Sequence, residues 1–197
     1  MKKLYFGATI LAVFLFVFQA YAGTPLGTVQ TNVNKVLEVL RDPALKDETA
    51  KEIKKAKLRT IYEPMFDEIE LAKRSLARNW NALDLAQRQE FVQLFRQVLE
   101  KAYIDKILSY TDEKVVFDKE TMLAENQAEV QTRIVTSSKE IPISYRVILK
   151  DGTWKVYDVI VEGVSLVQNY RTQFSDILAK NSPNELLEIL RKKVEES

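Results

Sequence analysis

The period of the hydrophobic pattern changes twice along the chain, and this change constrains the fold more than any other feature. Up to about residue 109, apolar residues recur at helical spacing. From residue 114 to residue 161 they alternate with a period of two, which indicates β-strands. After Gly163 the helical spacing returns. The pattern therefore predicts helices, then a curved antiparallel sheet, then helices, which is an α+β fold.

The first helical region should cover residues 23–110. The apolar stripe over residues 24–40 predicts the first helix, which Asp42-Pro43 ends. Residues 47–61 predict a short exposed helix that stops before Pro64.

Two further helices in this region have recognisable starts. Asp67 is a predicted N-cap, and Asp84 and Gln87 have capping-box spacing at the start of the longest helix, which should run to about Ser109. The inner face of the helix that follows Asp67 is predicted from four residues, namely Ile69, Ala72, Leu76 and Trp80.

About four strands are predicted in the sheet region, residues 114–161. They should cover residues 114–117, 129–136, 141–149 and 154–161. Asp151-Gly152 is a hairpin signal, and short connections favour an antiparallel meander. In the last strand Val156, Asp158 and Ile160 should lie on one face and Tyr157, Val159 and Val161 on the other. Both faces are largely apolar, which suits a strand covered on both sides.

The C-terminal region, residues 164–196, should again be helical. Residues 164–180 have the spacing of one helix. Ser182-Pro183 starts the next, with Glu185 three positions after the cap residue.

Residues 1–22 have the pattern of a secretory signal peptide. Two lysines precede an apolar run, and Ala20-Tyr21-Ala22 supplies a cleavage site after Ala22. A membrane anchor is the alternative, but the run is short for a membrane span. We therefore expect residues 23–197 to form a single domain outside the cytoplasm.

The composition excludes several classes of chemistry. The chain has no cysteine and no histidine, which removes thiol catalysis, Ser-His-Asp catalysis and transition-metal sites. Its 29 basic residues nearly balance its 28 acidic residues, so no basic excess favours nucleic acid. We expect no catalytic residue, no metal and no cofactor.

Four segments resemble one protein family over essentially the whole mature chain. They are PMFD (64–67), QRQEFVQLFRQVLEKAY (87–103), ISYRV (143–147) and WKVYDVIVEGVSLVQNYRTQF (154–174). They resemble the MlaC family of periplasmic phospholipid-binding proteins, also called toluene-tolerance auxiliary proteins. The chain departs from the family pattern at Glu68, where a hydrophobic residue is usual, and at Ala77, where a glycine is frequent.

The resemblance implies a fold similar to the nuclear-transport-factor-two-like and cystatin-like class, with acyl chains held between sheet and helices. It implies a periplasmic carrier that shuttles a phospholipid between membranes and supports outer-membrane lipid asymmetry. The implied partners are an inner-membrane ABC transporter complex with a ring of substrate-binding subunits and an outer-membrane lipoprotein complex. We expect a monomer with a bound phospholipid ligand.

The acyl chains should contact the long helix and the last two strands. The predicted lipid-binding residues are Leu99, Tyr103, Val147, Leu149, Val156 and Ile160. For each of them, ordinary core packing is the alternative. A Leu149→Trp substitution should block the cleft.

Three charged residues, Asp158, Glu162 and Arg171, lie in or beside this apolar region. Because a buried unpaired charge is costly, we expect Arg171 to pair with one or both carboxylates and to tie the last strand to the following helix. The alternative is a latch at the cleft mouth, with Arg171 near the phosphate.

Two other functions remain open at this stage. One is a carboxylate-based enzyme acting on a small apolar substrate in the same cavity, with Asp158 and Glu162 as a pair and Tyr145 assisting. The absence of histidine and of a glycine-rich phosphate loop argues against it. The other is a docking protein without a ligand, with residues 51–57 as a charged contact face.

Overall fold

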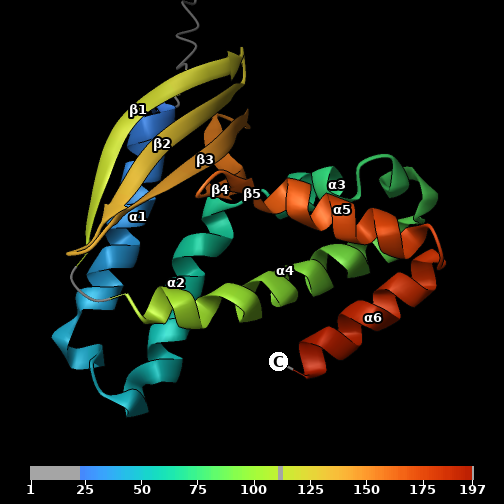
Figure 1. Cartoon of the computed structure of the whole chain (residues 1–197), viewed down its shortest axis with the longest axis horizontal. Coiled ribbons are helices and arrows are strands. Elements are labelled where there is room, and N and C mark those ends of the chain that lie inside the picture. Colours follow the sequence, from blue (N-terminus) through green and yellow to red (C-terminus); the bar gives the residue numbers. More distant parts are fainter. Residues whose placement is uncertain (1–22, 111–112, 197) are drawn as a thin grey trace, which may run out of the picture.

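The computed structural model describes residues 23–110 and 113–196, and the predicted signal peptide lies outside them. Four helices and three short 3-10 turns come first: α1 (Pro25–Arg41), η1 (Pro43–Leu45), η2 (Glu48–Ala50), α2 (Lys51–Met65), α3 (Glu68–Leu76), η3 (Ala77–Ala82) and α4 (Leu85–Leu108). The sheet and two helices follow: β1 (Lys114–Ala124), β2 (Gln127–Val135), β3 (Glu140–Lys150), β4 (Thr153–Val161), β5 (Val164–Ser165), α5 (Leu166–Leu178) and α6 (Pro183–Glu195). This order confirms the predicted α+β fold (Figure 1).

The sheet is an antiparallel meander in which each strand pairs with the next, in the order β1-β2-β3-β4-β5. Four of its strands were predicted, and the two-residue β5 was not. Asp151 and Gly152 have φ angles of 50° and 73°, so they form the tight hairpin turn that their sequence indicates. The strands curve over α1 in Figure 1.

Helix α1 packs against one face of the sheet, which we call the inner face. Its buried residues Val29, Val33 and Leu37 belong to one apolar cluster with residues of β2, β3 and β4. The sheet contributes Ala128, Val130, Val147, Trp154 and Val156 to this cluster. At the edge of the sheet, Phe66 bridges to Val156, and the Asp67 amide donates to the Val156 carbonyl at 2.9 Å. The start of α3 is therefore fastened to β4.

A second apolar cluster joins α3, α4, α5 and α6. Its centre is aromatic, with ring centroids of Phe91 and Phe174 5.2 Å apart and those of Phe95 and Tyr170 4.9 Å apart. Both pairs meet edge to face, which is the arrangement that aromatic rings favour. A third, smaller cluster of Leu40, Leu58 and Ile104 joins α1, α2 and α4. Helix α4 therefore buries its apolar residues against other helices.

The predicted helix starts are confirmed at single residues. Asp67 accepts a hydrogen bond from the Glu70 amide, and full capping boxes begin α4 at Asp84 and α6 at Ser182. Burial alone would raise the pKa of Asp67, but the Glu70 amide and the Lys150 ammonium, 3.0 Å away, lower it below its usual value.

Three local predictions were wrong. Helix α2 continues through Pro64, because the Phe66 amide still bonds to the Tyr62 carbonyl at 3.1 Å and Met65 is buried. Ile69 is 55% exposed instead of facing inward. Strand β1 extends to Ala124, since its second half is an exposed edge whose residues carry no alternation.

Candidate functional site

The inner face of the sheet is largely apolar, with the buried Thr132 as a polar residue in its middle, and only part of it is closed. Strand register places four residues beside the α1 cluster, and all four are at most 2% exposed: Ala128, Val130, Val147 and Val156. The same register continues along the inner face to six residues that keep accessible surface: Ile134, Ile141, Ile143, Tyr145, Val159 and Val161. We call these six the open half of the inner face.

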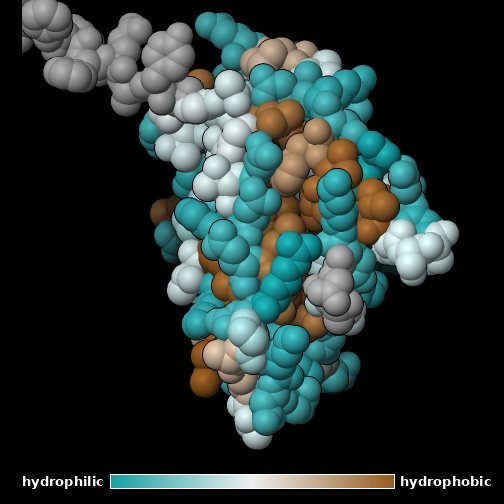
Figure 2. Space-filling view, turned by 90° about the vertical axis from the view of Figure 1, so that its left-hand side faces the viewer, coloured by the Kyte–Doolittle hydropathy of each residue, from teal (hydrophilic) through white to brown (hydrophobic). Residues whose placement is uncertain are grey.

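The helices contact the outer strands of the sheet more than β3. The main helix contacts come from α1 to β1 and β2, and from α2, α3 and α5 to β4. On the face of the molecule that carries β1 and α1, apolar side chains are visible in a strip between hydrophilic ones (Figure 2). An apolar surface that stays open to solvent is a feature of ligand or partner sites.

Tyr145 is a partly buried residue of the open half. It packs against the α1 cluster, and burial, with a smaller effect of neighbouring Tyr110, raises the pKa of Tyr145 to about 12. Its side chain nevertheless keeps accessible surface. Tyr145 therefore borders the closed part of the inner face and can still be reached by a ligand.

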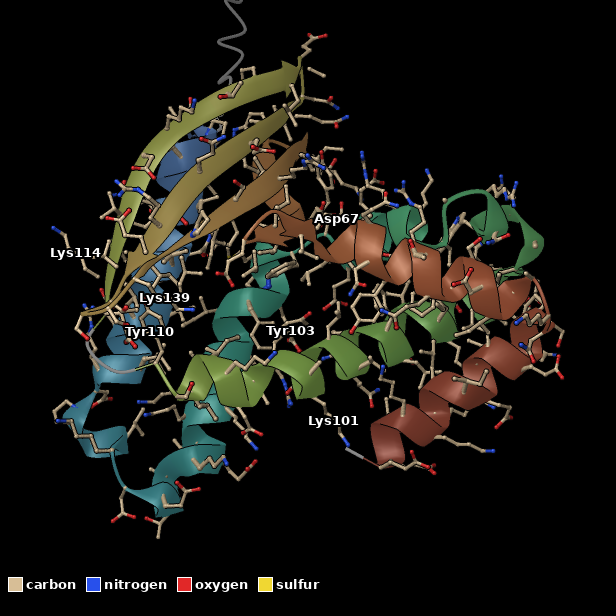
Figure 3. The ribbon with its side chains drawn as sticks, viewed as in Figure 1. Asp67, Lys101, Tyr103, Tyr110, Lys114 and Lys139 are labelled. Atoms are coloured by element: carbon tan, nitrogen blue, oxygen red, sulfur yellow. The ribbon has the colours of Figure 1, made fainter. Side chains whose placement is uncertain are left out.

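Tyr110 lies at the same end of the sheet, in the connection between α4 and β1 (Figure 3). Its ring packs against both the α1 cluster and the cluster of α1, α2 and α4. Burial, with a smaller effect of Glu113, raises its pKa to about 12. The hydroxyls of Tyr110 and Tyr145 therefore stay protonated at neutral pH.

Two predicted lipid-binding residues lie on α4. Leu99 packs at the border of the helical cluster. Tyr103 lies on the part of α4 that passes below the sheet in Figure 3, and burial raises its pKa. Its charge also contributes to the raised pKa of Tyr170, which places it near the start of α5. Both residues are partly buried, and Tyr103 lies outside the residues that form the helical cluster.

The predicted strand residues do not form one surface. Val147 and Val156 are buried under α1, and Leu149 packs against the same cluster. The pairing passes from Val147–Val156 to Arg146–Asp158, so Tyr157 is an extra, bulged residue. After this bulge the two faces of β4 are exchanged, so that Val159 and Val161 lie on the same face as Val156. Ile160 therefore pairs with Ser144 on the outer face, and the expected common side of Val156 and Ile160 is corrected.

The expected pairing of Arg171 with Asp158 or Glu162 is also corrected. Arg171 donates to the Arg74 carbonyl at 3.0 Å and to the Gln168 side chain at 3.3 Å. Glu162 is exposed in the turn between β4 and β5, with φ at 49°.

Asp158 instead ties the sheet to α5 by itself. It is 2% exposed and accepts hydrogen bonds from the Ser165 hydroxyl at 2.7 Å and the Val167 amide at 3.0 Å. Arg146 lies 3.6 Å away on the outer face. The two carboxylates, Asp158 and Glu162, therefore do not face each other as a catalytic pair would.

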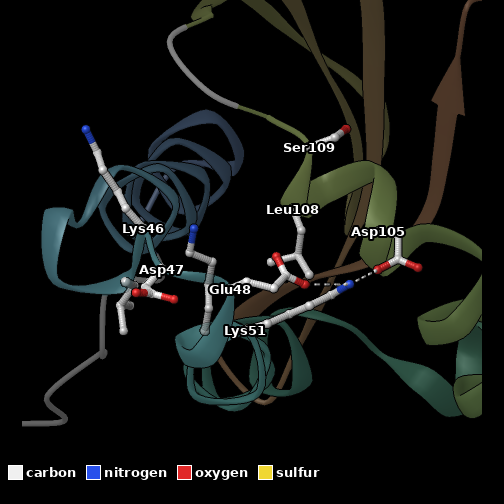
Figure 4. Close-up of a pocket in the computed structure, with 9 residues that line it drawn as sticks. Lys46, Asp47, Glu48, Lys51, Asp105, Leu108 and Ser109 are labelled. Carbon is white, nitrogen blue, oxygen red and sulfur yellow. Dashed lines mark ion pairs between the residues drawn. The ribbon is translucent and has the colours of Figure 1, made fainter.

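Two pockets with measurable volume lie away from the open half. One, of about 320 Å³, lies between the start of α2 and the end of α4, where Lys51 pairs with Asp105 at 3.4 Å and Glu48 at 3.7 Å (Figure 4). The other, of about 340 Å³, lies on the outer face and includes Arg171 and Asp158. Both are lined largely by charged and polar side chains, which do not suit acyl chains.

The fold and the half-open inner face define a class: an α+β protein whose curved antiparallel meander and surrounding helices leave part of an apolar sheet face accessible. A solved structure of a phospholipid-binding protein from Ralstonia solanacearum, in complex with a phospholipid, has the same fold. Its TM-score is 0.78 at 22% identity, over 87% of this chain and 97% of that one. None of the described helices is long and apolar enough to cross a membrane.

The family follows from sequence comparison. The MlaC protein family matches residues 30–192, so the chain belongs to the MlaC family. It is 24% identical over 185 residues to the intermembrane phospholipid transport system binding protein MlaC of Haemophilus influenzae, covering 87% of this chain and 86% of that one. It is 27% identical over 96 residues to toluene tolerance protein ttg2D of Pseudomonas putida, covering 48% of this chain and 45% of that one.

Proposed function

We propose that this protein is a periplasmic phospholipid carrier that holds the acyl chains of its ligand against the open half of the inner face. The observation that supports this most directly is the open half itself, where apolar residues of three strands share one face and keep accessible surface. The names of the H. influenzae relative and of the R. solanacearum structure, which describe phospholipid transport and binding, support the same ligand class.

The energetics of transfer fit a half-open apolar site. A diacyl lipid has roughly 30 methylenes, each worth about 0.8 kcal/mol on leaving water. A bilayer offers its tails similar shelter, so a carrier needs only to approach the affinity of the membrane. An accessible hollow allows the lipid to leave when a partner binds. A fully closed cavity would hold its ligand longer than transport requires.

The proposed route runs between an outer-membrane lipoprotein complex and an inner-membrane ABC transporter complex, and it would support lipid asymmetry of the outer membrane. The signal-peptide pattern of residues 1–22 supports a periplasmic location. Of the predicted lipid-binding residues, we retain Tyr103 as a direct contact and assign the other tail contacts to Ile143, Tyr145, Val159 and Val161.

An enzymatic function is less well supported. Asp158 is engaged by Ser165, Val167 and Arg146, and Glu162 is exposed to solvent. Neither carboxylate lies on the open half of the inner face, so a substrate held there would not meet the proposed catalytic pair.

Organic extraction of the purified protein followed by mass spectrometry tests the proposal. We expect about one phospholipid per chain. A vesicle-to-vesicle assay with a fluorescent phospholipid should then show transfer that grows with protein concentration. A protein that carries no lipid and accepts none from vesicles would contradict the proposed function.

A further inference from the structure

Two tyrosine hydroxyls, those of Tyr110 and Tyr145, lie at the open end of the inner face, and neither has a hydrogen-bond partner in the part of the chain that the structure describes. The Tyr110 hydroxyl is buried and makes no hydrogen bond to any residue that the structure describes. The Tyr145 hydroxyl likewise makes none within residues 23–110 and 113–196. Both rings pack against the cluster beneath the sheet, and Tyr110 is near enough to Tyr145 to raise its pKa slightly.

Phenylalanine would fill the same volume without this penalty. A buried hydroxyl without a partner loses its hydrogen bonds to water and gains nothing in return. Tyr110 carries such a buried hydroxyl, and Tyr145 beside it offers a second hydroxyl on a side chain that keeps accessible surface. A buried donor next to an accessible one in apolar surroundings indicates that a polar atom from outside the chain completes the site.

The chemistry of the position restricts what that atom can be. Both hydroxyls are protonated at neutral pH and can donate a hydrogen bond. An anionic phosphate is best matched by arginine or lysine. A neutral donor on an apolar wall matches a neutral acceptor that is carried into the hollow by acyl chains. In a diacyl phospholipid the ester carbonyls are the acceptors closest to the chains.

We propose that Tyr145, with Tyr110 beside it, binds an ester carbonyl of the phospholipid. This inference rests on the proposed function and adds to it a residue that fixes how deeply the lipid enters. It also gives a specificity: an ether-linked lipid with the same headgroup and chains lacks the carbonyl and should bind less well.

A competition between ester and ether lipids tests the inference. The protein is incubated with vesicles that contain equal amounts of diacyl and dialkyl phosphatidylcholine of equal chain length, then separated, extracted and analysed by mass spectrometry. The unmodified protein should take up the ester lipid in about fivefold excess, as one hydrogen bond allows. Tyr145→Phe should bring the ratio close to one, and Tyr110→Phe should reduce it partway. Because the ratio is internal, it does not depend on how much protein is folded.

Tyr62→Phe is the matched control. The Tyr62 hydroxyl is also buried, but Arg59 and Glu100 lie beside it and its ring packs in the cluster of α1, α2 and α4. Its removal should leave the ester preference unchanged. Equal uptake of both lipids by the unmodified protein, or a preference that survives in Tyr145→Phe, would overturn the inference while leaving the carrier function intact. Uptake of neither lipid would overturn the carrier function itself.

Discussion

At the scale of single residues, Asp158 carries the connection between the sheet and the C-terminal helices. Its carboxylate is 2% exposed and receives a hydroxyl, a backbone amide and a nearby guanidinium from three separate positions. Arg171, which the sequence suggested as its partner, is only partly buried and bonds to neutral groups. The buried Asp158 carboxylate therefore has its partners without Arg171, and we expect Arg171 to contribute less to stability.

This difference predicts unequal costs for two alanine substitutions. Asp158→Ala should lower the free energy of unfolding by about 3 kcal/mol, because it leaves Ser165, Val167 and Arg146 without their shared partner. Arg171→Ala should lower it by about 1 kcal/mol. Urea denaturation of both variants measures the difference. Equal losses of stability would instead support the direct pairing of Arg171 with Asp158 that the sequence suggested.

A second residue-scale prediction concerns Ala77, where glycine is frequent in the family pattern. Ala77 ends α3 with φ at 50° and ψ at −123°. Residues other than glycine rarely adopt this backbone conformation. Ala77→Gly should therefore raise the free energy of unfolding by about 1 kcal/mol. The control is Ala179→Gly at the end of α5, where φ is −69° and ψ −20°. That change should lower stability, and a thermal melt of each variant distinguishes the two signs.

At the scale of elements, the sequence predicted the features that depend only on neighbouring residues, such as helix caps and tight turns. The caps at Asp67, Asp84 and Ser182 and the hairpin at Asp151-Gly152 depend on neighbouring residues and were predictable. Strand β1 was predicted too short, because an exposed edge needs no alternating pattern. The bulge at Tyr157 arises from pairing with β3 and cannot be read from β4 alone.

The bulge also explains why the site was only partly predicted. Alternation alone placed Val156 and Ile160 together, whereas the bulge places Val159 and Val161 on the inner face. Tyr145 could have been found from the sequence, since it lies two positions before Val147 and shares its face. Tyr110 could not, because its role depends on how the connection between α4 and β1 folds back under the sheet.

Two neighbouring residues of β4 allow a test of this register. Val161→Trp should fill the open half and reduce the lipid recovered by extraction at least tenfold. Ile160→Trp places the same side chain on the outer face and should leave lipid binding unchanged. Both positions are partly exposed, so neither change overpacks the core. Loss of lipid in Ile160→Trp, with lipid retained in Val161→Trp, would refute the assigned faces.

At the scale of the whole molecule, separate apolar clusters explain why part of the inner face stays accessible. One cluster fixes α1 to the sheet, one holds α3 to α6 together, and a small one joins α1, α2 and α4. Because α4 satisfies its apolar residues against other helices, it does not need to close onto β3. The domain is thus stable in each part while the residues of the open half keep accessible surface.

An unfilled hollow predicts that the ligand contributes to the stability of the folded domain. A ligand that binds only the folded state, present at about 100 times its dissociation constant, adds about 2.7 kcal/mol. For a domain of this size, that corresponds to a rise in Tm of about 5 to 10 °C. Delipidated protein should therefore melt at a lower temperature than loaded protein, with the loss restored by phospholipid vesicles. Differential scanning calorimetry of both forms measures it.

The variant Val161→Trp supplies the control, because its own indole would occupy the hollow. Its Tm should be the same before and after delipidation, and vesicles should not change it. If delipidation leaves the Tm of the unmodified protein unchanged, lipid binding does not require the folded inner face. If both proteins gain equally from vesicles, the lipid stabilises a surface other than the open half of the inner face.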